Sequence, residues 1–172
     1  YDGILSTSKS INKDNALLNC RISGLDNNKP DLIIVDLKLK IKLNLKIFDK
    51  RNKRKIIIIT SIKKDKKIFL LKKRGVKFLF VNEKDYLINL NDLFKKLNKF
   101  GYCRILVESG LVFLNVLLKR NIISNLYIFK TSKNLGKYGK NNASSKLVKR
   151  LKLSNKINVN LGNDNLYKLR IK

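Results

Sequence analysis

The residues whose types and spacing most clearly permit chemistry are Glu108, Ser109 and Gly110. The apolar run before them is typical of a buried strand, and the leucines after them recur at helical spacing. A carboxylate at the end of a strand would then lie beside a helix N-terminus, where N–H groups and a partial positive charge can hold a phosphate. The glycine would let a ligand approach the backbone. The alternative is a plain tight turn between strand and helix with an exposed glutamate.

A second group of polar residues lies near the start of the chain. An apolar run at residues 2–7 predicts a strand, and the polar segment after it predicts a loop. That loop carries Ser10, Asp14 and Arg21, which could hydrogen-bond or pair with a polar ligand. Loops often carry such residues without a ligand, so their spacing alone does not assign them a role.

The elements that must position these residues follow from the apolar pattern. Near-continuous apolar runs predict buried strands, the first of them entered at Pro30. Helical spacing predicts an amphipathic helix around residues 68–71 and a longer one that starts after Asn89 and ends before Gly101. Alternating Lys and apolar residues at 38–46 fit either an edge strand or an extended connector. The predicted strands are 32–35, 56–60, 76–81, 104–107 and 126–129, followed by a glycine-containing turn at 134–139 and a closing hairpin of 156–160 with 166–171.

This order of elements predicts an α/β domain with a mixed, mostly parallel sheet that is closed by antiparallel strands. At 172 residues the chain fits one domain. It contains no glycine-rich dinucleotide fingerprint and no P-loop. No apolar run is long enough to span a bilayer. With two cysteines far apart and no histidine, we expect no metal site, no disulfide and a reducing, cytoplasmic location.

The net charge of +28 raises the possibility of a nucleic-acid-binding protein. The basic residues are spread along the whole chain, however, and Lys greatly outnumbers Arg. An excess of Asn and Ile accompanies them, which is the pattern that codon bias in an AT-rich genome produces. No recognised nucleic-acid-binding motif occurs among them. We therefore expect no nucleic-acid partner, and a positive potential that suits small anionic ligands.

Several short motifs, in order, resemble the reductase domain of the bifunctional riboflavin-biosynthesis deaminase-reductase. They include Asp2-Gly3-Ile4-Leu5, the run from Asn12 to Arg21, Gly24-Leu25, Pro30 with Ile33-Ile34-Val35-Asp36, Leu106-Val107-Glu108-Ser109-Gly110, and Leu135-Gly136. The resemblance covers nearly the whole chain. It implies a dihydrofolate-reductase-like three-layer fold. It also implies NADPH-dependent reduction of the ribosyl group of 5-amino-6-(5-phosphoribosylamino)uracil to the ribityl form.

The same resemblance implies roles for individual residues. Leu18, Arg21 and Glu108 match substrate contacts, and a guanidinium fork such as that of Arg21 suits a phosphate. No catalytic acid or base is implied, since hydride transfer is the chemistry of the cofactor. The residues that match cofactor contacts are Ser10, Asp14, Gly110, Leu111, Val112, Phe113, Leu114, Asn115 and Val116.

The chain also departs from the family pattern. Asn15-Ala16 and Leu37 replace residues that are common in the family, and Leu111 replaces a glycine or proline. We expect residues 1–172 to be a single reductase domain that lacks the family's first strand and its upstream deaminase domain, and to come from a longer multifunctional enzyme. The alternatives are a non-catalytic fragment or degenerate relative and, third, a nucleic-acid-binding protein. Oligomeric state stays open, a homodimer included.

Overall fold

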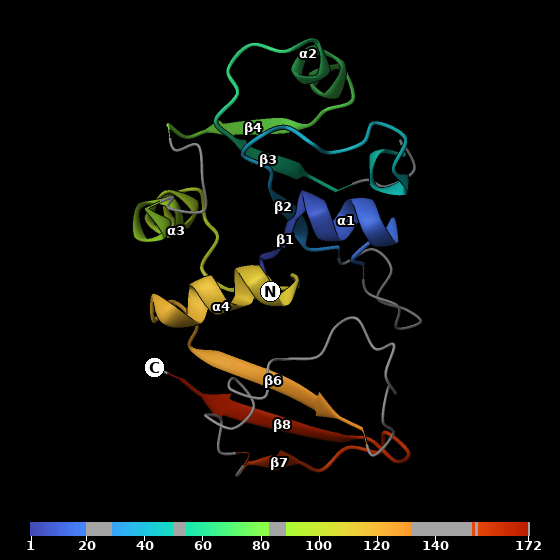
Figure 1. The fold of residues 1–172 in the computed structure, drawn as a ribbon, viewed down its shortest axis with the longest axis vertical. Coiled ribbons are helices and arrows are strands. Elements are labelled where there is room, and N and C mark those ends of the chain that lie inside the picture. Colours follow the sequence, from blue (N-terminus) through green and yellow to red (C-terminus); the bar gives the residue numbers. More distant parts are fainter. Residues whose placement is uncertain (20–28, 50–53, 83–88, 132–152, 154, 172) are drawn as a thin grey trace. The chain divides into compact units, whose positions relative to one another are not determined.

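The structure is a computed structural model that describes residues 1–19, 29–49, 54–82, 89–131, 153 and 155–171 (Figure 1). The chain divides into two compact units, Tyr1–Phe113 and Leu114–Lys172. Each unit is described by itself below.

The first unit is built on a sheet of five parallel strands in the order β4-β3-β2-β1-β5. Leu5 of β1 pairs with Ile33 of β2 on one side and with Val107 of β5 on the other. The central strands are almost entirely buried and mostly apolar, as expected of a parallel sheet covered on both faces. The strands are β1 (Gly3–Thr7), β2 (Asp31–Val35), β3 (Ile56–Thr60), β4 (Lys77–Phe80) and β5 (Ile105–Val107).

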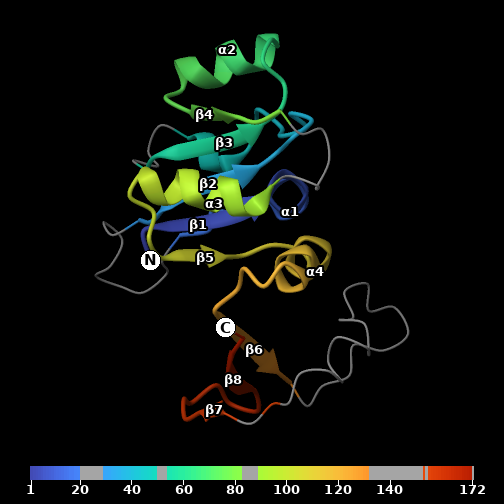
Figure 2. The ribbon, with the colours of Figure 1, turned by 90° about the vertical axis from the view of Figure 1, so that its left-hand side faces the viewer.

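Helices cover both faces of this sheet, with α1 and α3 on opposite sides of it (Figures 1 and 2). The side chain of Asn89 caps α3 by accepting a bond from the Asp92 amide, and Gly101 follows the helix with φ of 90°. The expected cap and stop of this helix are therefore confirmed. The helices of this unit are α1 (Ser8–Asp14), α2 (Lys66–Lys73) and α3 (Leu90–Lys99), with a 3₁₀ turn η1 (Lys46–Phe48). Helix α4 (Leu111–Lys119) begins at the end of this unit and continues into the second.

The prediction of a loop after the first strand is wrong for residues 8–14, which form α1. Thr7 provides the cap, its Oγ1 accepting from the Ser10 amide at 3.3 Å. Ile11 is 1% exposed and anchors the helix in the core. The helix stops at Asn15, which takes a left-handed φ of 46°. A single apolar residue among the seven of the helix gave too weak a periodic signal to predict it.

Two alternatives were expected for residues 38–46, an edge strand and a connector. The segment forms no strand and is therefore a connector. Its apolar side chains Leu39, Ile41 and Leu45 are buried and join the core cluster beside α1. The lysines between them are mostly exposed. The alternation that suggested an edge strand therefore reflects a connector with turns at Leu37-Lys38 and Leu43-Asn44, in which every second residue packs against the core.

The second unit holds an antiparallel sheet in the order β6-β8-β7, formed by β6 (Asn125–Lys130), β7 (Lys156–Ile157) and β8 (Asn165–Arg170). The predicted closing hairpin is confirmed by the pairing of β7 with β8. The expected α/β class, with parallel strands followed by antiparallel C-terminal strands, is also confirmed. In the described part of the chain the antiparallel strands form their own sheet. The turn expected at 134–139 lies outside the described residues.

Candidate functional site

The candidate site lies where the parallel strands of the first unit end. β1 runs directly into α1, β2 is followed by Asp36, and β5 is followed by Glu108, Ser109 and Gly110. The carboxyl ends of parallel strands share one edge of the sheet, which is where open α/β sheets bind ligands. Strand pairing thus gathers segments that are far apart in sequence.

Ser10 joins two of these segments directly. Its Oγ accepts a hydrogen bond from the Gly110 amide at 3.2 Å and lies 3.1 Å from Thr7 Oγ1. The contact connects α1 to the turn that opens α4, across 100 positions of the chain. The structure therefore brings together two residues that the family resemblance assigned to one cofactor.

The turn before α4 has room for a ligand near its backbone. A Cβ added at Gly110 would meet only Ser10 Oγ, at the ordinary contact distance of 3.7 Å. The first amides of a helix have no partner within the helix, which here applies to Leu111 and Val112 at the start of α4. Val112 is 67% exposed. These N–H groups are donors to which an anion could bind.

Glu108 and Ser109 have different surroundings in this turn. The Glu108 amide donates to the Leu5 carbonyl at 2.9 Å and continues the sheet ladder, while its side chain is exposed. Among the described residues its carboxylate has no ion pair. Ser109 Oγ is buried and has no hydrogen-bond partner in the described part of the chain. Buried polar atoms are rarely left unpaired except where strain, water or a ligand explains them.

Asp36 organises the end of β2. The Asp36 carboxylate is buried and accepts from Ser8 Oγ at 2.8 Å, from the Lys40 amide at 2.8 Å and from the Ile41 amide at 2.7 Å. It thereby ties the first residue of α1 to the connector after β2. Asn12 adds a second link, donating to the Lys40 carbonyl at 2.9 Å.

A groove of about 620 Å³ lies beside these hydrogen bonds of Asp36 and Asn12. Its volume falls within the range of small-molecule sites. This groove was not predictable from the sequence, because lysines occur along the whole chain and the groove depends on packing α1 against the connector. The groove is lined by five lysines, Lys9, Lys13, Lys38, Lys40 and Lys42, together with Ser8, Asn12, Val35, Asp36 and Leu37.

The other predicted site residues are distributed as follows. Asp14 is exposed at the last position of α1, one helical turn beyond Ser10. Leu18 packs against the core cluster, and its carbonyl accepts a 2.7 Å bond from Arg54, so the structure does not bring its side chain to the Ser10–Gly110 contact. Arg21 lies outside the described residues. The predicted cofactor residues of α4 form its first six positions, Leu111, Val112, Phe113, Leu114, Asn115 and Val116.

Neither a membrane-spanning helix nor a metal site occurs among the described residues. None of the described helices is long and apolar enough to cross a membrane. In the same part of the chain no three His, Cys, Asp or Glu side chains form a group that could hold a metal ion.

Comparisons with known proteins agree with this arrangement. The family model described as the RibD C-terminal domain matches residues 1–167. The riboflavin biosynthesis protein RibD of Buchnera aphidicola is 32% identical over 152 residues, which are 81% of this chain and 39% of that protein. The chain thus spans well under half the length of this curated relative.

Solved structures give the same fold. RibD of Acinetobacter baumannii superposes with a TM-score of 0.74 at 17% identity, covering 98% of this chain and 46% of that one. The riboflavin biosynthesis reductase Rib7 of Saccharomyces cerevisiae superposes with a TM-score of 0.70 at 26% identity, covering 98% and 75%. A Thermotoga maritima deaminase and 5-amino-6-(5-phosphoribosylamino)uracil reductase gives 0.71 at 17% identity, covering 99% and 45%.

Proposed function

The chain belongs to the family of RibD C-terminal domains, and from that premise we propose that it is an NADPH-dependent reductase domain of riboflavin biosynthesis. The reaction is reduction of the ribosyl group of 5-amino-6-(5-phosphoribosylamino)uracil to its ribityl form. The observation that carries the proposal is the hydrogen bond between Ser10 and the Gly110 amide. It places two segments with proposed cofactor contacts side by side at the ligand-binding edge of the sheet.

The cofactor is proposed to bind along this edge. The amides at the start of α4 would hold the pyrophosphate, with Gly110 leaving the backbone accessible. Asp14 stands one turn beyond Ser10 on the same helix and is proposed as a further cofactor contact. The lysine-lined groove beside α1 supports NADPH over NADH, because the additional phosphate of NADPH is a dianion that lysines attract.

The substrate is proposed to use the remaining groups. Glu108 has an exposed carboxylate that can accept bonds from ribose hydroxyls or pyrimidine N–H groups. Arg21 is proposed to bind the substrate phosphate, and Leu18 remains a proposed substrate contact through the family resemblance. When bound, the nicotinamide supplies the hydride, and the chain's own contribution is to hold the two ligands in a reactive alignment.

The parent protein is proposed to carry a deaminase domain as well. The Thermotoga maritima relative is a deaminase and reductase in one chain, and this chain covers 45% of it.

Titration with NADPH, followed by nicotinamide fluorescence, tests the cofactor site. In Gly110→Val the branched side chain would obstruct approach to the backbone, so NADPH affinity should fall tenfold or more, the effect of losing one charge-assisted hydrogen bond. Gly110→Ala should give a smaller loss without unfolding, because its Cβ fits at 3.7 Å from Ser10. Wild-type protein should bind NADPH more tightly than NADH.

Lys119→Ala, at the far end of the same helix, is the matched control and should retain the wild-type affinity. Thermal melting of each variant separates unfolding from loss of binding. Unchanged affinity in a folded Gly110→Val protein would contradict the cofactor assignment. A wild-type chain that binds no NADPH would favour the non-catalytic relative instead.

A further inference from the structure

One face of the antiparallel sheet in the second unit collects polar and basic side chains. Asn125 of β6 pairs directly with Arg170 of β8, and Tyr127 pairs with Lys168. Residues paired across antiparallel strands point to the same face, and so do residues two apart along one strand. Asn125, Tyr127, Lys168 and Arg170 therefore share one face, and all four are exposed.

The strand on the other side completes this face. The Lys168 amide donates to the Asn155 carbonyl at 2.9 Å, which sets Asn155 opposite Lys168. Lys156 pairs with Tyr167 and so belongs to the opposite face. The Lys168 ammonium lies 5.9 Å from the centre of the Tyr127 ring. This cation–π contact favours a position of the ammonium above the same face of the sheet.

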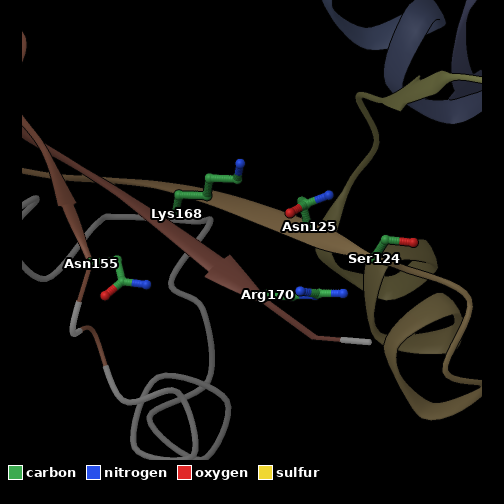
Figure 3. A pocket seen from close by; sticks show the side chains of 5 residues that line it. All are labelled: Ser124, Asn125, Asn155, Lys168 and Arg170. Atoms are coloured by element: carbon green, nitrogen blue, oxygen red, sulfur yellow. The ribbon is translucent and has the colours of Figure 1, made fainter.

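A pocket of about 540 Å³ opens on this face (Figure 3). It contains two different cationic groups and three neutral hydrogen-bonding groups. No carboxylate occurs among the described residues that line it. The lining residues are Ser124, Asn125, Asn155, Lys168 and Arg170.

We propose that this pocket binds a phosphate dianion, either free or as the ester of a small molecule. A guanidinium fork and an ammonium together match the charge and the several acceptor oxygens of a phosphate, and amide and hydroxyl donors can bind the remaining oxygens. The volume lies in the range of small-molecule sites, which leaves space for an organic group attached to the phosphate. The site is separate in sequence from the proposed cofactor residues and does not depend on the proposed reductase activity.

Two-dimensional amide NMR of the 19.9 kDa chain tests this proposal. Inorganic phosphate and glycerol 3-phosphate are titrated separately, with sodium chloride at matched ionic strength as the blank. Both should shift the amide signals around Ser124, Asn125 and Lys168 in a saturable manner. A tighter fit for glycerol 3-phosphate would identify an ester as the ligand, and equal affinities would identify free phosphate.

Lys168→Gln should weaken phosphate binding about tenfold, as expected for loss of one charge-assisted hydrogen bond. Asn155→Asp, which puts a carboxylate into the pocket, should weaken it further and tests the site if the first variant folds poorly. Lys156→Gln removes the same charge from the opposite face and should change affinity less than twofold.

Equal weakening by Lys156→Gln and Lys168→Gln would overturn the proposal, since it would mean diffuse attraction to a basic surface. Shifts that do not saturate, or that chloride reproduces, would overturn it as well.

Discussion

The two ends of the parallel sheet in the first unit use polar residues in different ways. At the amino ends, Tyr102 Oη donates to Asp31 Oδ2, and the Lys55 ammonium lies 3.6 Å from the same carboxylate and 5.0 Å from the Tyr102 ring centre. Burial and the bond to Asp31 raise the pKa of Tyr102. The bond to Tyr102 raises the pKa of Lys55. The hydroxyl of Tyr102, the carboxylate of Asp31 and the ammonium of Lys55 are thus all paired with one another.

At the carboxyl ends, the bonded groups hold the backbone, and much of the charge is left facing outward. Asp36 binds Ser8 and two amides, whereas the Glu108 carboxylate is exposed and shows no ion pair within the described residues. A closed polar cluster mainly stabilises the fold. An open one can exchange water for ligand, which is the behaviour expected of a binding edge.

Of the substitutions that test this difference between the two ends of the sheet, Asp36→Ala should have the largest effect. In Asp36→Ala the Ser8 hydroxyl and the amides of Lys40 and Ile41 lose their acceptor. Buried unpaired groups cost about 1–3 kcal/mol each, so the free energy of unfolding should fall by about 3 kcal/mol or more, a large part of the usual 5–15 kcal/mol. NADPH affinity should fall too, because Ser8 opens the helix that carries Ser10. Urea unfolding and fluorescence titration measure the two effects.

The matched control for this variant is Asp65→Ala. Asp65 also accepts a backbone bond, from the Lys67 amide at 2.6 Å, but at the exposed start of α2. Loss of such a cap costs about 1 kcal/mol. If both variants lose equal stability, or if Asp36→Ala keeps full NADPH affinity, Asp36 does not organise the site.

Tyr102→Phe should have a smaller effect, confined to stability. It removes a hydrogen bond to a carboxylate, worth about 1.5–3 kcal/mol, and leaves the ring packed. NADPH affinity should not change, because the cluster lies at the other end of the strands. The exposed Tyr127→Phe is the control and should stay within about 0.5 kcal/mol of wild type. Weaker NADPH binding by Tyr102→Phe would mean that the two ends are energetically coupled.

The sequence predicted the strands well because β-branched apolar runs are a strong local signal. Residues 56–60, for example, are four isoleucines and a threonine, and all five are buried in β3. Helix α3 was predicted from its leucine spacing and from Asn89 at its start. Helix α1 was missed because Ile11 is its only apolar residue.

The candidate site was only partly predictable. The family resemblance named both Ser10 and Gly110, and strand order then brought them into contact. The lysine groove gave no local signal, since lysines are frequent throughout the chain. The pairing of Tyr102 with Asp31 spans 71 positions and depends on tertiary structure alone.

The smallest expected effect is a pH dependence at Asp2. The Asp2 carboxylate accepts bonds from the Cys103 and Arg104 amides at 2.8 and 2.6 Å, which link the start of β1 to that of β5. The bond from the Arg104 amide is the main cause that lowers the pKa of Asp2. A carboxylate with a lowered folded pKa stabilises the protein above its unfolded pKa of about 3.9, and this contribution disappears as the pH falls through the folded value.

Asp2→Asn should therefore reduce the unfolding midpoint slightly at pH 7. Since the carboxylate is fully exposed, the difference should be small. It should shrink steadily below about pH 4, where the wild-type carboxylate becomes protonated. Urea unfolding of both proteins between pH 7 and pH 3 measures this, and NADPH affinity at pH 7 should be equal in the two. A difference in stability that stays constant over the whole pH range would show that the charge of Asp2 contributes nothing and that only its shape matters at this end of the sheet.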